Sequence, residues 1–105
     1  MVYNLDKIDS REFIPGFHGK MIHGDKTTMA YWDIEQGASV QQHSHHHEQV
    51  VNVLEGRFEM DVNGTIHQLE AGDVLLIPSH VSHGGTARTR CRILDVFTPV
   101  REEYR

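Results

Sequence analysis

A hairpin in the middle of the chain constrains the fold more than any other feature. Residues 57–62 alternate strictly between polar and apolar side chains, Asn63-Gly64 favours a tight type I′ turn, and residues 65–69 run back. The sequence therefore predicts two antiparallel strands joined at residues 63–64.

Short segments of the same character flank this hairpin, and each is bounded by turn-forming residues. Pro78 ends one of them, because proline cannot donate a hydrogen bond to a neighbouring strand. No stretch is long and periodic enough to predict a helix. The remaining predicted strands are residues 27–34, 49–54, 74–77 and 91–98, with breaks at 24–26, 36–37, 55–56 and 70–73. Many short strands at near-even spacing are typical of a β-sandwich or a closed barrel, so the predicted class is all-β.

Length, charge and cysteine content narrow the functional classes. A chain of 105 residues has room for one domain, residues 1–105, with one modest core. Fifteen acidic residues outnumber ten mostly scattered basic ones, so nucleic acid is not an expected partner. Residues 1–16 lack an apolar run, which predicts a soluble, cytoplasmic protein without membrane contact. The single cysteine, Cys91, falls in an apolar segment and is expected to be buried and inert.

Nine histidines are present, and four of them crowd into residues 43–47. Imidazole is the commonest protein ligand for first-row transition metals. His43 and His45 are separated by one residue, so in an extended backbone they point the same way and form two arms of a candidate metal site. His83 is a further candidate. The identity of the divalent metal stays open among nickel, zinc, iron, manganese and cobalt.

Two spaced motifs contain these histidines. The first, residues 37–56, consists of Gly37, five residues, His43, one residue, His45, three residues, Gln49, six residues and Gly56. The second, within residues 72–87, consists of Gly72, five residues, Pro78, one residue, His80, two residues and His83. In this order they resemble the two motifs of the cupins, which are double-stranded β-helix proteins of the jelly-roll kind. The resemblance implies a jelly-roll barrel with metal ligation by His43, His45, Gln49 and His83.

Three positions depart from the cupin motifs, which usually have glutamate at Gln49, glycine at His80 and asparagine at Ala87. Three neutral imidazoles and a neutral amide would leave a divalent ion with its full formal charge. Such an ion should prefer an anionic substrate and Lewis-acid chemistry to redox cycling. In the alternative interpretation, Gln49 only hydrogen-bonds a pocket group, while Glu48 or water completes the site.

The other histidines have simpler expected positions. His46 and His47 lie between the candidate ligands, where the loop is expected to turn them toward solvent. His80 is expected to line the mouth of the site and to contact the substrate. The remaining three, His18, His23 and His67, are expected to be ordinary surface or half-buried residues.

The last predicted strand places a carboxylate on an apolar face, because Ile93, Asp95 and Phe97 share one side by alternation. A carboxylate there must be paired, must gain a proton through a raised pKa, or must face a polar cavity. The last two situations are those that acid–base catalysis uses. The alternative is a structural ion pair of Asp95 with Arg101 or Arg57.

Residues 95–101 read aspartate, any residue, phenylalanine, threonine, proline, any residue, arginine. This pattern resembles the C-terminal signature of the KdgF-type cupins of pectin and alginate breakdown. The resemblance implies an isomerase that converts 4,5-unsaturated monouronates, the products of polysaccharide lyases, to the linear keto form. It also implies that Asp95 and Arg101 are catalytic and that Phe97 and Arg101 bind the substrate. The alternatives are a solvated charge for Arg101 and a plain core position for Phe97.

Two other functions stay open at this stage. One is a cupin dioxygenase, which would act on a small organic substrate in an apolar pocket. The other is a binding module that holds a metal or a small acid without chemistry. By analogy with small cupins, a homodimer is expected, in which residues 1–16 form an arm that packs on the partner.

Overall fold

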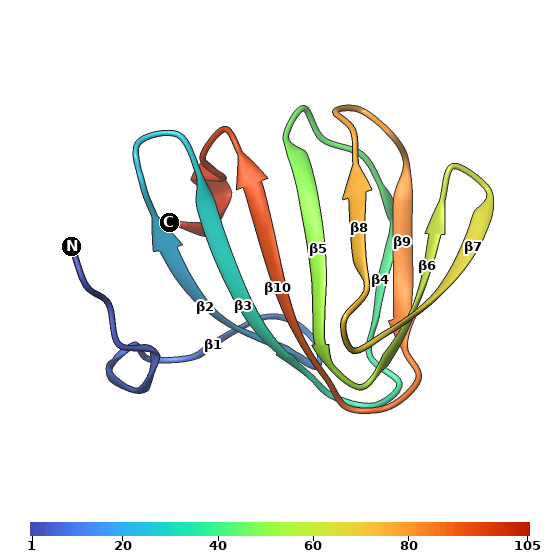
Figure 1. Ribbon diagram of the computed structural model, residues 1–105, viewed down its shortest axis with the longest axis horizontal. Coiled ribbons are helices and arrows are strands. Elements are labelled where there is room, and N and C mark those ends of the chain that lie inside the picture. The colour runs from blue at the N-terminus through green and yellow to red at the C-terminus, as the bar shows by residue number, and fades with distance from the viewer.

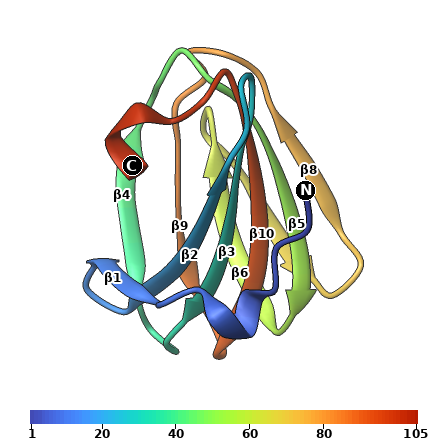
Figure 2. The same cartoon turned by 90° about the vertical axis from the view of Figure 1, so that its left-hand side faces the viewer.

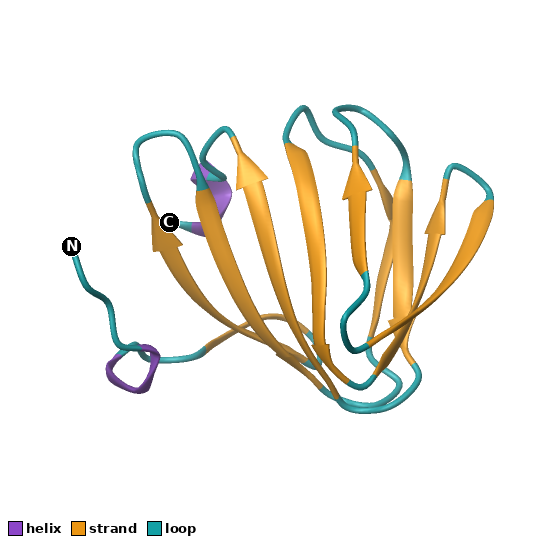
Figure 3. Cartoon of the chain, in the orientation of Figure 1, coloured by secondary structure: helices purple, strands orange, loops and turns teal.

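The computed structural model describes residues 1–105 and consists almost entirely of strands (Figure 1 and Figure 3). The only helical segments are two three-residue 3₁₀ turns, η1 (Leu5–Lys7) and η2 (Glu102–Tyr104), and neither could cross a membrane. The strands are β1 (Arg11–Ile14), β2 (Phe17–His23), β3 (Thr28–Ile34), β4 (Ser39–His43), β5 (Glu48–Glu55), β6 (Arg57–Val62), β7 (Thr65–Glu70), β8 (Val74–Ile77), β9 (His83–Ala87) and β10 (Cys91–Thr98).

The strands form two antiparallel sheets that face each other. One sheet has six strands in the order β1-β2-β3-β10-β5-β8, and the other has four in the order β4-β9-β6-β7. From β3 onward the chain passes back and forth between the sheets, as a jelly-roll barrel does. The predicted all-β class and jelly-roll barrel are therefore confirmed.

The predicted hairpin is present as β6 and β7, which pair from Arg57 opposite Glu70 to Val62 opposite Thr65. Asn63 and Gly64 have φ angles of 50° and 88°. A type I′ turn requires positive φ at both central positions. The predicted strands 74–77 and 91–98 coincide with β8 and β10, and the other predictions differ from the observed strands only at their ends.

The sequence pattern does not predict four of the strands, namely β1, β2, β4 and β9. β4 is mostly polar, and β9 contains two consecutive glycines, so neither shows the alternation of a half-buried strand. A Cβ on Gly85 of β9 would lie 2.4 Å from the carbonyl oxygen of Glu59, so the close approach of β6 requires glycine there. Within the expected arm, residues 1–16, β1 pairs with β2 of the same chain, and packing of this segment on a partner stays a prediction. A single chain does not test the expected homodimer, which stays a prediction.

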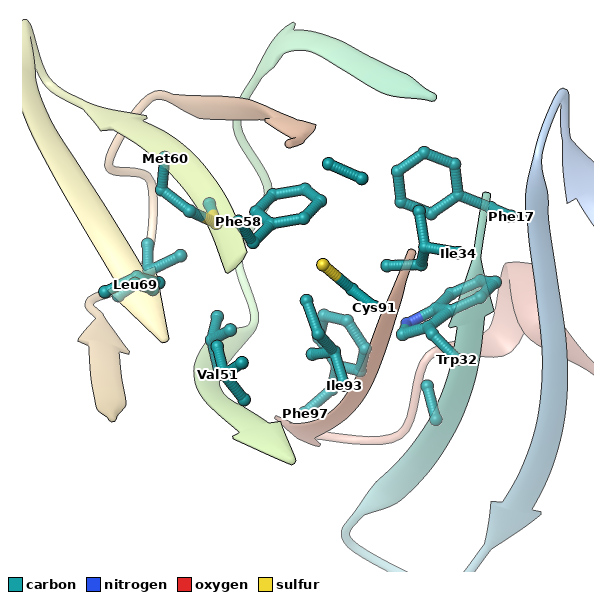
Figure 4. Packing of buried hydrophobic residues seen from close by; sticks show 14 residues of the cluster. Phe17, Trp32, Ile34, Val51, Phe58, Met60, Leu69, Cys91, Ile93 and Phe97 are labelled. Atoms are coloured by element: carbon teal, nitrogen blue, oxygen red, sulfur yellow. The ribbon is translucent and has the colours of Figure 1, made fainter. Parts of the chain in front are cut away.

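Fourteen buried apolar side chains pack together between the sheets (Figure 4). In β3 every second residue is buried, and Trp32 and Ile34 lie on the inner face, a choice that alternation alone leaves open. Cys91 is buried as expected, and burial raises the pKa of its thiol. Burial of each large side chain contributes roughly 1.5–3 kcal/mol, so this cluster is the main source of the barrel's stability.

The two ends of the barrel differ. The loops 44–47 and 78–82 and the turn η2 lie together at the upper end in both views (Figure 1 and Figure 2). A cavity of about 940 Å³ lies between the sheets, and its wall includes residues of β3, β4, β5, β9, β10 and η2. Side chains at the upper ends of these strands can therefore meet in one space.

Gly56 closes the first of the two sequence motifs, and its replacement by alanine should destabilise the barrel. Its φ is +84°, and a Cβ would lie 2.2 Å from the carbonyl oxygen of Arg90. Gly64 has a similar φ of +88° but open space around it. We expect Gly64→Ala to lower the free energy of unfolding by about 1 kcal/mol through backbone strain alone, and Gly56→Ala to lower it by about 3 kcal/mol because a clash is added. Denaturant unfolding of both variants measures this, and equal losses would contradict the expectation.

Candidate metal centre

Three histidines converge at the upper end of the barrel. His43 ends β4, His83 begins β9 and pairs with His43 across the sheet, and His45 lies in the loop that leads to β5. Their candidate ligand nitrogens lie within 4.8 Å of one another. The His83 ring centroid is 4.3 Å from that of His43 and 4.9 Å from that of His45. The structure thus brings together the three histidines that the motifs single out.

Backbone hydrogen bonds set the tautomer of each of these rings. Nδ1 of each histidine lies 2.7–3.0 Å from a carbonyl oxygen two residues away in the chain, on Gln41 for His43, His47 for His45 and Val81 for His83. A carbonyl oxygen only accepts, so Nδ1 carries the proton and Nε2 keeps its lone pair. This is the arrangement in which the backbone orients an imidazole for metal binding through Nε2.

The donor set fits a divalent transition metal. His83 is 2% exposed, and its Nε2 has no hydrogen-bond partner. A buried polar atom without a partner costs roughly 1–3 kcal/mol, and a bound metal would satisfy it. Burial lowers the pKa of His83 and, together with the charge of Arg101, lowers that of His45 to about 4. Both rings are therefore neutral at neutral pH, the form that binds a metal.

Gln49 supplies the fourth candidate donor. It is buried at the start of β5, and its Oε1 lies 3.1 Å from Nε2 of His45. With Nδ1 of His45 protonated, both atoms present lone pairs, an arrangement that a shared cation would stabilise. The Gln49 amide also favours the charged form of Asp95. A glutamate at this position would instead bring two carboxylates together and raise the pKa of one of them.

Asp95 projects from β10 into the cavity between Ile93 and Phe97, on the face that alternation predicts. The Trp32 indole donates a hydrogen bond of 3.0 Å to Oδ2, while Oδ1 is buried without a partner. Burial raises the pKa of Asp95 to about 6, although Gln49, Trp32 and Arg101 all favour its charged form. No basic group lies within 4 Å of the carboxyl, so the alternative of a structural ion pair does not hold. This carboxyl can therefore change its protonation near neutral pH.

Arg101 follows β10, and its side chain is only 12% exposed. The guanidinium lies 4.7 Å from the ring centroid of Phe97 and 4.2 Å from that of Tyr104, and it pairs with Glu103. Arg101 and Phe97 line the same cavity as Asp95 and three of the candidate metal ligands, His43, Gln49 and His83. The alternative of a solvated tail charge is thus excluded for Arg101.

His80 does not line the cavity, and its side chain is exposed. Its φ of 67° lies in the left-handed region, which explains why the motif usually has glycine there. The backbone N–H of His80 donates a hydrogen bond of 2.7 Å to the His45 carbonyl, so this residue supports the histidine loop through its main chain. The expectation that His80 lines the mouth of the site does not match this cavity wall, and a substrate contact of its side chain stays a prediction.

His47 is 3% exposed, so the expectation that it faces solvent is also wrong, whereas His46 is exposed. His47 Nε2 donates a hydrogen bond of 3.2 Å to the carbonyl of Val100, which ties the histidine loop to the C-terminal segment. Alternation carries no information within such a loop. The sequence pattern also misses Glu103 and Tyr104 as cavity residues. For Trp32, alternation places it on one face with Ile34 but leaves open which face of the strand borders the cavity.

A second group of possible metal ligands, Glu12, His18 and Glu35, lies at the surface. His18 Nε2 is 2.7 Å from a carboxylate oxygen of Glu35 and 3.6 Å from one of Glu12. The hydrogen bond to Glu35 raises the pKa of His18. Ion pairing of a protonated imidazole accounts for this group.

Comparisons with protein families and with solved structures both find cupins. The family model for the cupin domain matches residues 30–97. No protein with a curated description matches the chain. Among solved structures, KdgF from Halomonas sp. is similar with a TM-score of 0.95 and 26% identity, over 100% of this chain and 98% of that chain.

Two further solved structures are similar. An RmlC-like cupin from Shewanella frigidimarina NCIMB 400 has a TM-score of 0.91 and 31% identity, over 95% of this chain and 91% of that chain. A salicylate 1,2-dioxygenase from Pseudoaminobacter salicylatoxidans has a TM-score of 0.76 and 22% identity, over 81% of this chain and 27% of that chain. The second likeness shows a shared fold only.

His43→Ala should abolish metal binding, because it removes one of three converging imidazoles. The matched control is His46→Ala, which removes an exposed histidine three residues away and should retain the metal. We expect wild-type protein and His46→Ala to bind one equivalent of a divalent transition metal. The affinity of His43→Ala should fall by more than the roughly 10- to 100-fold that is typical of outer-shell changes. Elemental analysis and calorimetric titration measure this, and equal affinities for the two variants would exclude His43 as a ligand.

Proposed function

The chain belongs to the cupin family, and we propose that it is a metal-dependent isomerase that converts a 4,5-unsaturated monouronate to its linear keto form. The observation that carries the proposal is the position of Asp95. Its buried carboxyl has a raised pKa and a free oxygen, and it lines the same cavity as Arg101 and three of the four candidate metal ligands. The likeness to KdgF over the whole chain supports the same assignment.

Arg101 would bind the substrate carboxylate. A guanidinium presents parallel N–H donors that match the two oxygens of a carboxylate. The side chain is largely withdrawn from water, so its charge is poorly screened. Burial lowers the pKa of His45 and His83 and this charge lowers both further, whereas at Asp95 it opposes the rise in pKa that burial causes. Phe97 and Tyr104 flank the guanidinium and would form an aromatic wall for the sugar ring.

A divalent metal held by His43, His45, Gln49 and His83 would supply Lewis acidity toward the substrate oxygens. Residues of the chain would then carry out the proton transfers. Opening of the ring requires a base that takes the proton from the anomeric hydroxyl while the bond from carbon 1 to the ring oxygen breaks. An acid must then protonate carbon 4, so that the enolate becomes the ketone.

Asp95 is suited to both proton transfers. A carboxyl with a pKa of about 6 accepts a proton at neutral pH and releases it again without a large penalty. The Trp32 indole holds one oxygen and leaves the other free. The overall reaction is an isomerisation, so the proton taken from the hydroxyl can be the one delivered to carbon 4.

One observation favours a second candidate function, a cupin dioxygenase. Much of the cavity wall is apolar, with residues that include Phe17, Val51, Phe58, Met60 and Ile93. An apolar wall would suit a small aromatic substrate better than a hydroxylated sugar acid. Oxygen consumption with such substrates distinguishes this candidate. A protein inert in both assays that still binds a small acid or a metal tightly would instead be a binding module.

The metal-loaded protein should accelerate the loss of ultraviolet absorbance of unsaturated galacturonate or of its alginate-derived counterpart. The absorbance falls because the conjugated double bond is lost when the ketone forms. The test compares the initial rate with that in buffer and with that of His43→Ala. No acceleration over the buffer rate with either substrate would refute the proposed isomerase.

Asp95→Asn should lower kcat roughly 10²- to 10⁴-fold, the range typical of general acid–base groups. The variant should keep its metal. At pH 7, above the pKa of about 6, burial of the charged carboxylate opposes folding, so the neutral amide should not lower the melting temperature. Asp33→Asn removes a carboxylate from the outer surface and serves as the matched control. Full activity in Asp95→Asn would remove Asp95 from the mechanism.

A further inference from the structure

The C-terminal turn η2 contains an acidic side chain for which the proposed reaction has no use. Glu103 lines the cavity and pairs with Nε of Arg101. We propose that Glu103 is a positioning residue, which fixes the Arg101 guanidinium so that its two Nη groups stay available for the substrate carboxylate. This inference rests on the proposed function and extends it to the recognition of the substrate.

The main chain around Arg101 is held in three places. The Arg101 N–H donates a hydrogen bond of 2.9 Å to Oγ1 of Thr28, which is fully buried at the start of β3. The preceding carbonyl, of Val100, accepts the hydrogen bond from His47. The Arg101 carbonyl accepts a bond of 3.1 Å from the N–H of Tyr104, which closes the turn. The point from which the Arg101 side chain starts is therefore fixed.

The side chain needs further restraint, because arginine has several rotatable bonds. The rings of Phe97 and Tyr104 hold the guanidinium plane through cation–π contacts at 4.7 and 4.2 Å. Such contacts restrict the plane but leave rotation within it. The directed bond from Nε to Glu103 fixes that rotation.

Both Nη groups remain without a protein partner. The Nη1 and Nη2 pair forms the end of the guanidinium that can grip a carboxylate with two parallel hydrogen bonds. Arg101 lines the same cavity as the candidate ligands His43 and His83. A substrate carboxylate bound at this end would be placed beside the metal centre.

The neighbouring acidic residue provides a matched control. Glu102 precedes Glu103 in the same turn, but its side chain is 73% exposed and pairs with Arg105. Glu102 is not part of the cavity wall. Glu102→Ala therefore removes the same charge from the same turn and leaves the contacts of Arg101 in place.

The experiment compares Glu103→Ala, Glu103→Gln and Glu102→Ala in metal-loaded protein, with unsaturated galacturonate as substrate. We expect KM to rise about tenfold or more in Glu103→Ala, because the oriented charge-assisted bond is lost. It should rise less in Glu103→Gln, because the amide oxygen still accepts from Nε. kcat should change less than about threefold in all variants, and Glu102→Ala should match wild type. A KM within about twofold of wild type in Glu103→Ala would overturn the proposal, as would a lower KM, which would mean that Glu103 competes with the substrate.

Calorimetric binding of saturated galacturonate to the same proteins separates this inference from the proposed reaction. The dissociation constant should follow the same order as KM. Wild-type protein that binds galacturonate more tightly than Glu103→Ala but does not turn over the unsaturated sugar would refute the isomerase and keep the positioning role. Turnover by wild type with unchanged binding in Glu103→Ala would refute the positioning role alone. Absence of both binding and turnover in wild type would refute both.

Discussion

The register of β10 is the constraint on which the rest of the structure depends. β10 pairs with β3 on one side and with β5 on the other, so hydrogen bonds hold it along both edges. With the register fixed on both sides, its inward side chains cannot slip to the other face. One strand therefore contributes both to the apolar core, through Ile93 and Phe97, and to the cavity, through Asp95. The high cost of burying a charged carboxylate in that row is what raises the pKa of Asp95.

The candidate metal centre depends on a different principle, since its ligands are oriented by nearby main chain. Each imidazole is directed by a carbonyl two residues away, so a short segment carries both the ligand and the group that orients it. Gln49 joins this centre to β10, because its amide lies between His45 and Asp95. Because glutamine replaces the glutamate that the motif usually has, position 49 does not place a second carboxylate beside that of Asp95.

The strands that the sequence predicts are those whose burial alternates, such as β3, β6 and β10. β4 and β9 could not be predicted in this way, because they are polar or glycine-rich and owe their pairing to their neighbours. Within the site, the spacing of His43, His45 and His83 predicts the histidine cluster, and the alternation around Asp95 predicts that its side chain faces inward. The differences at His47 and His80 arise where periodicity ends, since loop side chains take directions set by tertiary contacts. Glu103 and Tyr104 escape prediction for the same reason.

The segment that follows β10 belongs to neither sheet, yet Arg101, Glu103 and Tyr104 all reach the cavity. The guanidinium that would bind a carboxylate and the side chain that holds it are thus separated in the chain from the histidines and from the paired strands. The main chain of this short stretch is held by Thr28 and His47, whereas the side chains of Arg101 and Glu103 make no contact within either sheet's hydrogen-bond ladder. The part of the wall that would select a ligand is therefore the part that contributes least to the pairing of the strands.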